Sequence, residues 1–330
     1  MLIKIYIKNC RIYYCFNPQI LQGLILLKNF FGYRHLVFNV ASLCHSLVHS
    51  VHCSSTPNSP LTTHHSQLPA HYSPKIIFLC TSKLDELIKT IKVGAVSYLN
   101  TKPLLYGIKN GFVIENMELT EGYPAKIAEM LLNDEIDVGL VPVAILPKMK
   151  DHYIVSDYCI GAEGPVASVC LFSEVPLDKI EKVLLDYQSR TSVALAKILL
   201  NSYWKISPVL EDAKEDFREH ITGTTAAVVI GDRAFEQRTK SRYVYDLAET
   251  WKTFTGLPFV FAAWIANKKL PDDFIARFNT ANAIGLNTID KVVDENPYSL
   301  YDLKKYFTQN ISYNLTPEKK EGLKKFLSLL

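Results

Sequence analysis

The first part of the chain lacks acidic residues: residues 1–84 contain neither Asp nor Glu. Average usage, with about a quarter of residues charged and roughly half of those acidic, would place about ten there. Residues 1–90 hold 8 Lys and Arg against 2 acidic residues, whereas residues 91–330 hold 28 against 31. Low apolar content at residues 54–73 favours disorder. We therefore expect residues 1–90 to be a disordered or spurious extension that is no part of the fold.

The chain also lacks an uninterrupted apolar run long enough to span a membrane. The apolar stretch 20–31 contains Lys28 and Asn29 and falls short of the roughly 18 residues that a spanning helix needs. No small-residue cleavage site of a secretory signal follows this stretch. We expect a cytoplasmic location and no membrane partner. Because no Met occurs between Met1 and Met117, we also interpret residues 1–90 as upstream sequence translated ahead of the true start.

Motifs for nucleotides, zinc and a nucleophilic serine are missing. The sequence has no G-x-G-x-x-G after a strand, no G-x-x-x-x-G-K-[ST] loop, no G-x-S-x-G, and no Cys or His set with the spacing of a zinc site. Beyond residue 90 the only cysteines are Cys159 and Cys170, so a disulfide framework is not expected there. The Lys residues of this part are scattered, which excludes the basic patch that nucleic acid requires. We expect no cofactor, no metal and no nucleic-acid partner.

From residue 91 onward, short apolar runs alternate with amphipathic segments that carry Pro or capping residues near their starts. We predict strands at residues 91–98, 117–119, 138–141, 164–172, 183–186, 226–231 and 259–266. We predict a helix that begins near residue 100, and further helices at residues 125–132, 191–204, 246–254, 272–293, 300–307 and 317–329. Strands that alternate with helices predict an α/β fold with a parallel sheet.

Two long apolar segments, at residues 167–172 and 259–266, bracket a block of roughly 90 residues with its own alternation of strands and helices. Such an insertion predicts lobe I, with residues 91–170 and 260–330, and lobe II, with residues 171–259. One continuous doubly wound sheet is the alternative. In both arrangements a ligand binds at the carboxyl ends of the strands, where loops and helix N-termini meet.

Small polar residues follow several of the predicted strands. They occur at residues 97–101, 164–168 and 186–192, where free backbone N–H groups and a helix N-terminus can meet an anion. Each of these segments could also be an ordinary turn or helix cap. The guanidinium of Arg190 could pair with a substrate carboxylate or with Asp186. The sequence therefore offers an anion site without any metal or cofactor.

Six segments resemble, in order, the motifs of the chorismate dehydratase family of the futalosine route to menaquinone. They are VGAVSYLNTKPL (93–104), DVGLVPV (137–143), GPVASV (164–169), SRTSV (189–193), IGD (230–232) and TGLPFVFAAW (255–264). The resemblance spans residues 91–330 and implies a two-lobed, type II periplasmic-binding-protein-like fold. It implies a hydro-lyase without a cofactor that converts its small-molecule substrate, chorismate, to 3-[(1-carboxyvinyl)oxy]benzoate. A non-catalytic solute-binding or sensor protein of the same fold and the sister 1,4-dihydroxy-6-naphthoate synthase are the alternatives.

Polar side chains within these segments are the site residues that the resemblance implies. Only Asp232 among them is a carboxylate, and it could instead cap a helix. We therefore hypothesise that the enolpyruvyl carboxylate of the substrate is the base, held by the catalytic side chains of Asn100 and Ser168. The other members are predicted to bind substrate: Ser97, Thr101, Ser189, Arg190, Thr191 and Asp232. Arg190, Thr191 and the helix N-terminus beside them would hold the ring carboxylate.

Overall fold

The computed structural model describes residues 2–7, 10–15 and 90–330, and the chain divides into two units, residues 1–72 and residues 73–330. In the first unit β1 (Leu2–Ile7) pairs antiparallel with β2 (Cys10–Cys15). The disorder predicted at residues 54–73 falls outside the described residues, and the exclusion of residues 1–90 from the fold stays a prediction. Among the helices that the structure describes, none is long and apolar enough to cross a membrane.

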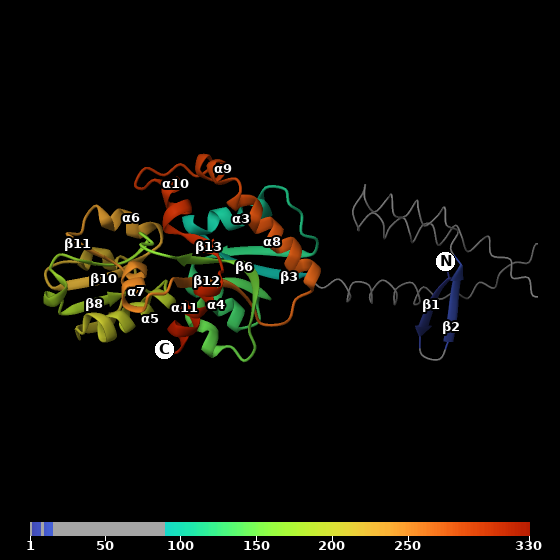
Figure 1. Cartoon of the computed structure of the whole chain (residues 1–330), viewed down its shortest axis with the longest axis horizontal. Coiled ribbons are helices and arrows are strands. Elements are labelled where there is room, and N and C mark those ends of the chain that lie inside the picture. Colours follow the sequence, from blue (N-terminus) through green and yellow to red (C-terminus); the bar gives the residue numbers. More distant parts are fainter. Residues whose placement is uncertain (1, 8–9, 16–89) are drawn as a thin grey trace, which may run out of the picture. The chain divides into compact units, whose positions relative to one another are not determined.

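A six-stranded mixed sheet forms the centre of the part that we call lobe I (Figure 1). Its strands, in the order β13-β6-β12-β5-β3-β4, are β3 (Ile91–Val96), β4 (Met117–Gly122), β5 (Val138–Pro142), β6 (Tyr153–Ala162), β12 (Phe259–Ala266) and β13 (Ser312–Asn314). β3 runs parallel to β4 and β5, whereas β12 runs antiparallel to β5 and β6. All residues of β5 are buried, as is usual for a strand covered on both faces.

A five-stranded mixed sheet forms the centre of the part that we call lobe II. Its strands, in the order β11-β7-β10-β8-β9, are β7 (Val169–Ser173), β8 (Lys182–Leu185), β9 (Val209–Asp212), β10 (Thr225–Ile230) and β11 (Tyr243–Asp246). β8 runs parallel to β9 and β10, whereas β7 runs antiparallel to β10 and β11. Each sheet thus combines parallel strands with an antiparallel strand that enters from the other lobe, and in the lobe I sheet the edge strand β13 also runs antiparallel to its neighbour β6.

Helices cover both faces of each sheet, as Figure 1 shows for α3 and α8 on one face of the lobe I sheet and α4 and α11 on the other. The helices of lobe I are α3 (Lys102–Lys109), α4 (Pro124–Leu132), α8 (Asp272–Leu286), α9 (Ile289–Asp294), α10 (Leu303–Lys305) and α11 (Pro317–Leu327). Those of lobe II are α5 (Thr191–Ile198), α6 (Asp232–Arg238) and α7 (Leu247–Thr255). Short 3-10 turns lie at Leu99–Thr101, Val143–Lys148, Leu177–Lys179 and Phe217–His220, and π-helical turns at Leu199–Trp204 and Tyr306–Asn310.

The chain crosses between the lobes twice, from β6 to β7 and from α7 to β12. Asp246 begins α7, because its carboxylate accepts the N–H groups of Ala248 and Glu249 at 3.1 and 3.2 Å. Gly256 ends the helix in the left-handed region, with φ 75°, and turns the chain into the second crossing. The two crossings and the common plan of the sheets confirm the predicted two-lobed, periplasmic-binding-protein-like α/β fold.

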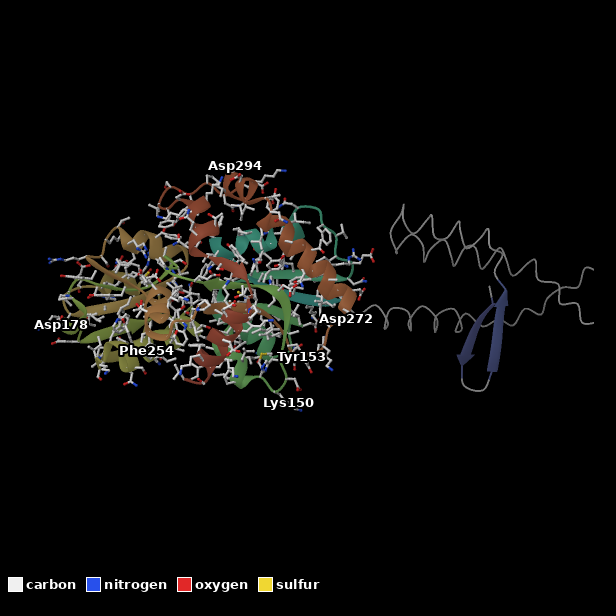
Figure 2. The ribbon with its side chains drawn as sticks, in the orientation of Figure 1. Lys150, Tyr153, Asp178, Phe254, Asp272 and Asp294 are labelled. Carbon is white, nitrogen blue, oxygen red and sulfur yellow. The ribbon has the colours of Figure 1, made fainter. Side chains whose placement is uncertain are left out.

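Apolar side chains fill the interior, and one cluster of buried residues extends from the lobe I sheet into lobe II. A second, smaller cluster that includes Phe172 and Phe217 lies within lobe II. Most charged side chains lie at the periphery, as Figure 2 shows for Lys150, Asp178 and Asp272, whereas Asp186, Asp246 and Lys319 are buried. The burial of apolar surface at about 25 cal/mol per Å² is therefore what holds the two sheets and their helices together.

Several details differ from the prediction. The sheets are mixed rather than parallel, because the strand that enters from the other lobe runs against its neighbours. Residues 164–168 form a loop rather than the start of a strand, and β7 begins only at Val169. The helix predicted at residues 272–293 is broken at Thr288, whose φ of −130° and ψ of 37° are not helical. The helix predicted at residues 300–307 begins at Leu303 and continues as a π-helical turn.

The sequence did not predict β6, β9, β11 or β13. Polar Ser156 and Asp157 interrupt the apolar pattern of β6, and the other three strands have only three or four residues each. The division into lobes at residues 170/171 and 259/260 stays a proposal. Cys170 lies in β7 of the lobe II sheet and Phe259 in β12 of the lobe I sheet, so sheet membership changes within two residues of the proposed boundaries.

Candidate functional site

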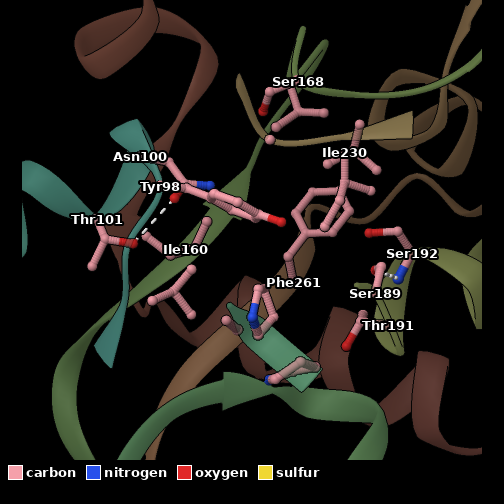
Figure 3. Close-up of a pocket in the computed structure, with 17 residues that line it drawn as sticks. Tyr98, Asn100, Thr101, Ile160, Ser168, Ser189, Thr191, Ser192, Ile230 and Phe261 are labelled. Carbon is pink, nitrogen blue, oxygen red and sulfur yellow. Dashed lines mark hydrogen bonds between the residues drawn. The ribbon is translucent and has the colours of Figure 1, made fainter. Parts of the chain in front are cut away.

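A pocket lies between the two lobes, beside both crossings of the chain. It contains about 520 Å³ of space between the lining atoms, and this figure includes space that is open to solvent. Its lining residues are Val96, Tyr98, Asn100, Thr101, Pro124, Pro142, Ile160, Val166, Ser168, Val169, Ser189, Thr191, Ser192, Ile230, Gly231, Phe261 and Ala262. Figure 3 shows Tyr98, Asn100 and Thr101 on the side opposite Ser189, Thr191 and Ser192.

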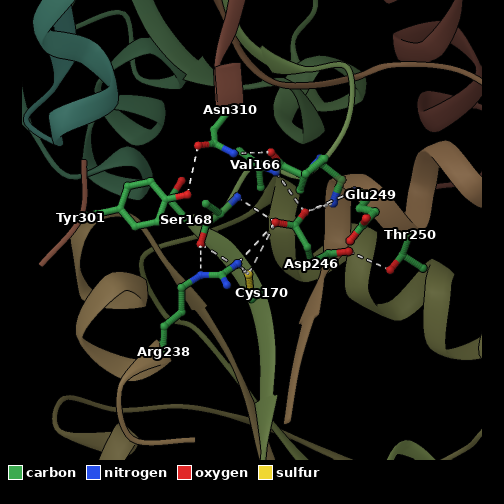
Figure 4. Close-up of polar contacts among 12 residues, drawn as sticks. Val166, Ser168, Cys170, Arg238, Asp246, Glu249, Thr250, Tyr301 and Asn310 are labelled. Atoms are coloured by element: carbon green, nitrogen blue, oxygen red, sulfur yellow. Dashed lines mark hydrogen bonds and ion pairs between the residues drawn. The ribbon is translucent and has the colours of Figure 1, made fainter. Parts of the chain in front are cut away.

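Ser168 is placed by a strained loop at the first crossing. Ala167, next to it, has a φ of +64°, a conformation that is costly for a residue with a side chain. The buried carboxylate of Asp246 accepts the N–H groups of Val166 and Ala167 at 3.1 and 2.7 Å, and Arg238 Nε donates to the Ala167 carbonyl at 2.8 Å (Figure 4). Burial raises the pKa of the Asp246 carboxyl, and these N–H donors act against that rise. The loop is thus held in its conformation by charged groups from β11 and α6.

Asn100 is placed by the 3-10 turn that follows β3. The Tyr313 hydroxyl donates to the Asn100 carbonyl at 2.9 Å, which fixes its backbone. The Thr101 hydroxyl donates to Asn100 Oδ1 at 3.1 Å. The Asn100 side chain also lies within hydrogen-bonding reach of the Tyr306 hydroxyl, so its amide NH₂ can donate to that hydroxyl or to an anion in the pocket.

Several hydrogen bonds join the lobes around the pocket. The Asp232 carboxylate accepts the Leu99 N–H at 3.1 and 3.3 Å, and the Tyr98 hydroxyl donates to Gln188 Oε1. The Ala144 N–H donates to the Thr191 hydroxyl at 3.1 Å. Burial raises the pKa of the Asp232 carboxyl, while the Leu99 N–H lowers it. The two lobes are therefore in direct contact beside the pocket, and lobe closure over a site can exclude water from a reaction.

Asp186 does not pair with Arg190, which corrects one of the two partners considered for that arginine. Arg233 from α6 donates to both carboxylate oxygens of Asp186, at 2.9 and 2.7 Å. Asp186 also accepts the N–H groups of Gln188 and Ile230 at 3.0 and 3.1 Å. This ion pair fixes the turn before α5 and the end of β10, and it leaves Arg190 without an acceptor among residues 90–330.

The predicted site residues divide into two groups. Five of the eight line the pocket: Asn100, Thr101, Ser168, Ser189 and Thr191. Ser97, Arg190 and Asp232 lie outside the lining, and their binding roles stay predictions. Asp232 is not the cap of α6, because Gly231 occupies that position and the Asp232 carboxylate bonds to lobe I instead.

Sequence reasoning missed several residues of the site. Tyr98 lies inside a matched segment, and its aromatic ring fills the centre of the pocket wall (Figure 3). Burial raises the pKa of the Tyr98 hydroxyl, so this hydroxyl stays protonated at neutral pH. Ser192 and Gly231 also lie in matched segments and could have been found there. Tyr306, whose hydroxyl donates to Ser168, follows no strand and lies in no matched segment, so no local signal identified it.

Two curated dehydratases are similar to this chain along most of their own length. The chorismate dehydratase of Thermus thermophilus is 27% identical over 261 residues, 72% of this chain and 94% of that protein. The chorismate dehydratase of Campylobacter jejuni subsp. jejuni is 28% identical over 244 residues, 71% of this chain and 95% of that protein. Both are dehydratases by name, and the prediction of a lyase is confirmed.

The fold is also similar to a solved structure. The crystal structure of protein AF1704 from Archaeoglobus fulgidus matches with a TM-score of 0.59 and 14% identity, over 72% of this chain and 96% of that chain. A family profile described as menaquinone biosynthesis matches residues 91–330, which is well over half of the chain. This match, together with the two similar dehydratases, confirms the resemblance seen in the sequence. The chain belongs to the menaquinone biosynthesis family.

Proposed function

We propose that the chain is a chorismate dehydratase that converts chorismate to 3-[(1-carboxyvinyl)oxy]benzoate. The observation that carries the proposal is the convergence of three matched segments, around Asn100, Ser168 and Thr191, on one pocket between the lobes. These segments lie far apart in the sequence, and each contributes small polar groups to an otherwise apolar cavity. The names of the two similar dehydratases support the same substrate.

The reaction is a loss of water that makes an aromatic ring. The C–H bond at the ring carbon that bears the enol ether breaks, and the C–O bond of the neighbouring hydroxyl breaks. The electrons of the C–H bond complete the ring, and the proton and the hydroxide leave together as water. Aromatisation supplies the driving force, so no electrons are exchanged with a second reactant.

The substrate's own carboxylate is the base in this proposal. Among the described residues that line the pocket, Tyr98 alone is titratable, and burial raises the pKa of its hydroxyl rather than lowering it. The carboxylate of Asp232 is already bonded to the Leu99 N–H. The enolpyruvyl carboxylate, by contrast, belongs to the group that is joined through the ether oxygen to the reacting ring carbon. A fixed intramolecular geometry makes such a weak base effective.

Polar groups on both lobes hold the substrate's two carboxylates. The Asn100 amide and the Ser168 hydroxyl hold the enolpyruvyl carboxylate, while Thr191 and Arg190 hold the ring carboxylate at the start of α5. A helix N-terminus contributes roughly 0.3–1 kcal/mol to an exposed anion and up to about 2 kcal/mol to a partly buried one. Several groups must therefore act together to bind the dianion.

Arg190→Ala tests the predicted anchor of the ring carboxylate. We expect the KM for chorismate to rise by about tenfold or more, because a charged hydrogen bond is worth about 1.5–3 kcal/mol. The melting temperature is expected to stay within about 2 °C of wild type, since Arg190 has no hydrogen-bond partner among residues 90–330. Steady-state kinetics and thermal unfolding measure the two quantities. A large fall in melting temperature with an unchanged KM would show a structural role instead.

Conversion of chorismate by the purified protein tests the proposal directly. Mass spectrometry is expected to show a product lighter than chorismate by one water, with the ultraviolet absorption of a substituted benzoate. Calorimetric binding of chorismate without turnover would favour the solute-binding or sensor alternative. Neither binding nor turnover would leave the sister naphthoate synthase as the better assignment within the fold. The cytoplasmic location stays a prediction.

A further inference from the structure

The hydroxyl of Tyr306 contacts Ser168, one of the residues that line the pocket. Tyr306 begins the π-helical turn Tyr306–Asn310 and is fully buried, and its hydroxyl donates to Ser168 Oγ at 2.7 Å. Tyr306 is not among the residues that line the pocket. Any effect of Tyr306 on the substrate would therefore pass through Ser168, or through Asn100, whose side chain also contacts the Tyr306 hydroxyl.

Ser168 has one hydroxyl proton, and that proton is available to a group bound in the pocket. Its backbone N–H donates to the Val166 carbonyl at 2.8 Å, and its carbonyl accepts the Gly231 N–H at 2.9 Å. A serine oxygen can accept two hydrogen bonds and donate one. Because the Tyr306 O–H occupies an acceptor position of Oγ, and no acceptor for the Ser168 proton is found in the described part of the chain, that proton is free to meet an anion.

The Tyr306 ring is held firmly enough to act as a fixed support. It packs edge-to-face against Phe235 of α6, with ring centroids 4.9 Å apart and planes at 90°. The Ile311 N–H donates to the Tyr306 carbonyl at 2.9 Å, which closes the π-helical turn. Such turns are frequent at functional sites. Burial raises the pKa of the Tyr306 hydroxyl, so it remains a donor across the neutral range.

We propose that Tyr306 is a positioning residue for the dehydration: its hydroxyl donates to Ser168 Oγ and thereby aims the Ser168 proton at the substrate's enolpyruvyl carboxylate. The proposal rests on the proposed function. In this proposal Tyr306 takes part in the reaction although it touches no substrate atom. The carboxylate acts as base only in one orientation. Loss of the hydrogen bond that orients the Ser168 hydroxyl therefore lowers the rate of the proton transfer more than it lowers substrate binding.

Tyr306→Phe removes the hydroxyl and keeps the packed ring. We expect kcat to fall by about tenfold or more, and KM to change by less than about twofold. Tyr301→Phe is the matched control, because Tyr301 stacks on the same Phe235, with centroids 4.5 Å apart, and its hydroxyl bonds to Asn310 rather than to Ser168. This control is expected to retain the kcat of wild type. A tenfold fall in both variants would assign the effect to the aromatic cluster and overturn the proposal.

A double-mutant cycle with Ser168 separates positioning from general stability. In a Ser168→Ala background the hydroxyl that Tyr306 positions is gone, so Tyr306→Phe is expected to lower kcat by a much smaller factor than in wild type, and the remaining loss comes from the contact of the Tyr306 hydroxyl with Asn100. Equal fold losses in the presence and absence of the Ser168 hydroxyl would show that Tyr306 acts independently of Ser168. If Tyr306→Phe fails to fold, Phe235→Leu keeps the Tyr306 hydroxyl but removes its ring contact, and an unchanged kcat in that variant would overturn the proposal.

The wild-type assay distinguishes failure of the proposed function from failure of the positioning role of Tyr306. Wild-type protein that does not convert chorismate defeats the proposed function, and the positioning role with it. Wild-type protein that converts chorismate, together with a Tyr306→Phe variant that keeps its kcat, defeats only the positioning role.

Discussion

Ser168→Ala and Asn100→Ala are each expected to lower the kcat for chorismate by about a hundredfold, with the melting temperature within a few degrees of wild type. Each variant removes a donor to the carboxylate that takes the proton, and misplacement by about 1 Å can cost on the order of a hundredfold. The control is Ser173→Ala in β7, the strand that follows Ser168, because Ser173 is also fully buried but its hydroxyl bonds to the Val175 carbonyl. Stopped assays of product formation and thermal unfolding measure both effects.

The pH dependence of the same reaction tests the identity of the base. Within residues 90–330 the only titratable side chain that lines the pocket is Tyr98, whose pKa is raised by burial above its usual value of 10. The wild-type rate is therefore expected to stay nearly flat from about pH 6 to 8. If Asp232 were the base, its raised pKa would make the rate fall as the pH drops through that value. A stable Asp232→Asn protein that binds chorismate but has lost turnover would contradict the substrate-as-base proposal.

Most of the strands and helices, and five of the residues that line the pocket, could be predicted because their signals are local. A buried strand followed by Ser, Asn or Thr and then a helix places polar groups at a strand's carboxyl end, whatever the rest of the chain does. Asn100 and Thr191 were found in this way, and the structure brings both to one pocket. The matched segments added the expectation that the strand ends belong together.

The remaining contacts join residues that are far apart in the sequence, and the hydrophobic periodicity of the sequence does not predict such contacts. Asp186 had Arg190 as a candidate partner nearby in sequence, but the partner it takes is Arg233, delivered by β10 and α6. Asp232 has the sequence context of a helix cap, yet the closed lobes place the Leu99 N–H within its reach. Tyr306 approaches Ser168 from 138 residues away. In each case tertiary packing selects among partners that are chemically equivalent.

Gly231→Ala is expected to lower the melting temperature by several degrees and to reduce turnover by about a hundredfold. Gly231 has a φ of +66° and a ψ of −151°, a region open essentially to glycine alone, and strain of this kind costs about 1–3 kcal/mol. A Cβ at this position would lie 2.9 Å from two ring carbons of Tyr98 on the opposite lobe. The Gly231 N–H also donates to the Ser168 carbonyl, so displacement of Gly231 disturbs both lobe closure and the predicted catalytic serine.

Gly223→Ala separates backbone strain from the contact with Tyr98. Gly223 also has a positive φ, +55°, but a Cβ there would meet no atom within 4 Å, so this variant is expected to lose stability without losing turnover. Tyr98→Ala supplies the complementary test, because it removes the ring that the new Cβ would strike. In that background Gly231→Ala is expected to lower the melting temperature no more than Gly223→Ala does. If Gly231→Ala is as mild as Gly223→Ala while Tyr98 is present, the close approach of Tyr98 to Gly231 does not control closure of the lobes.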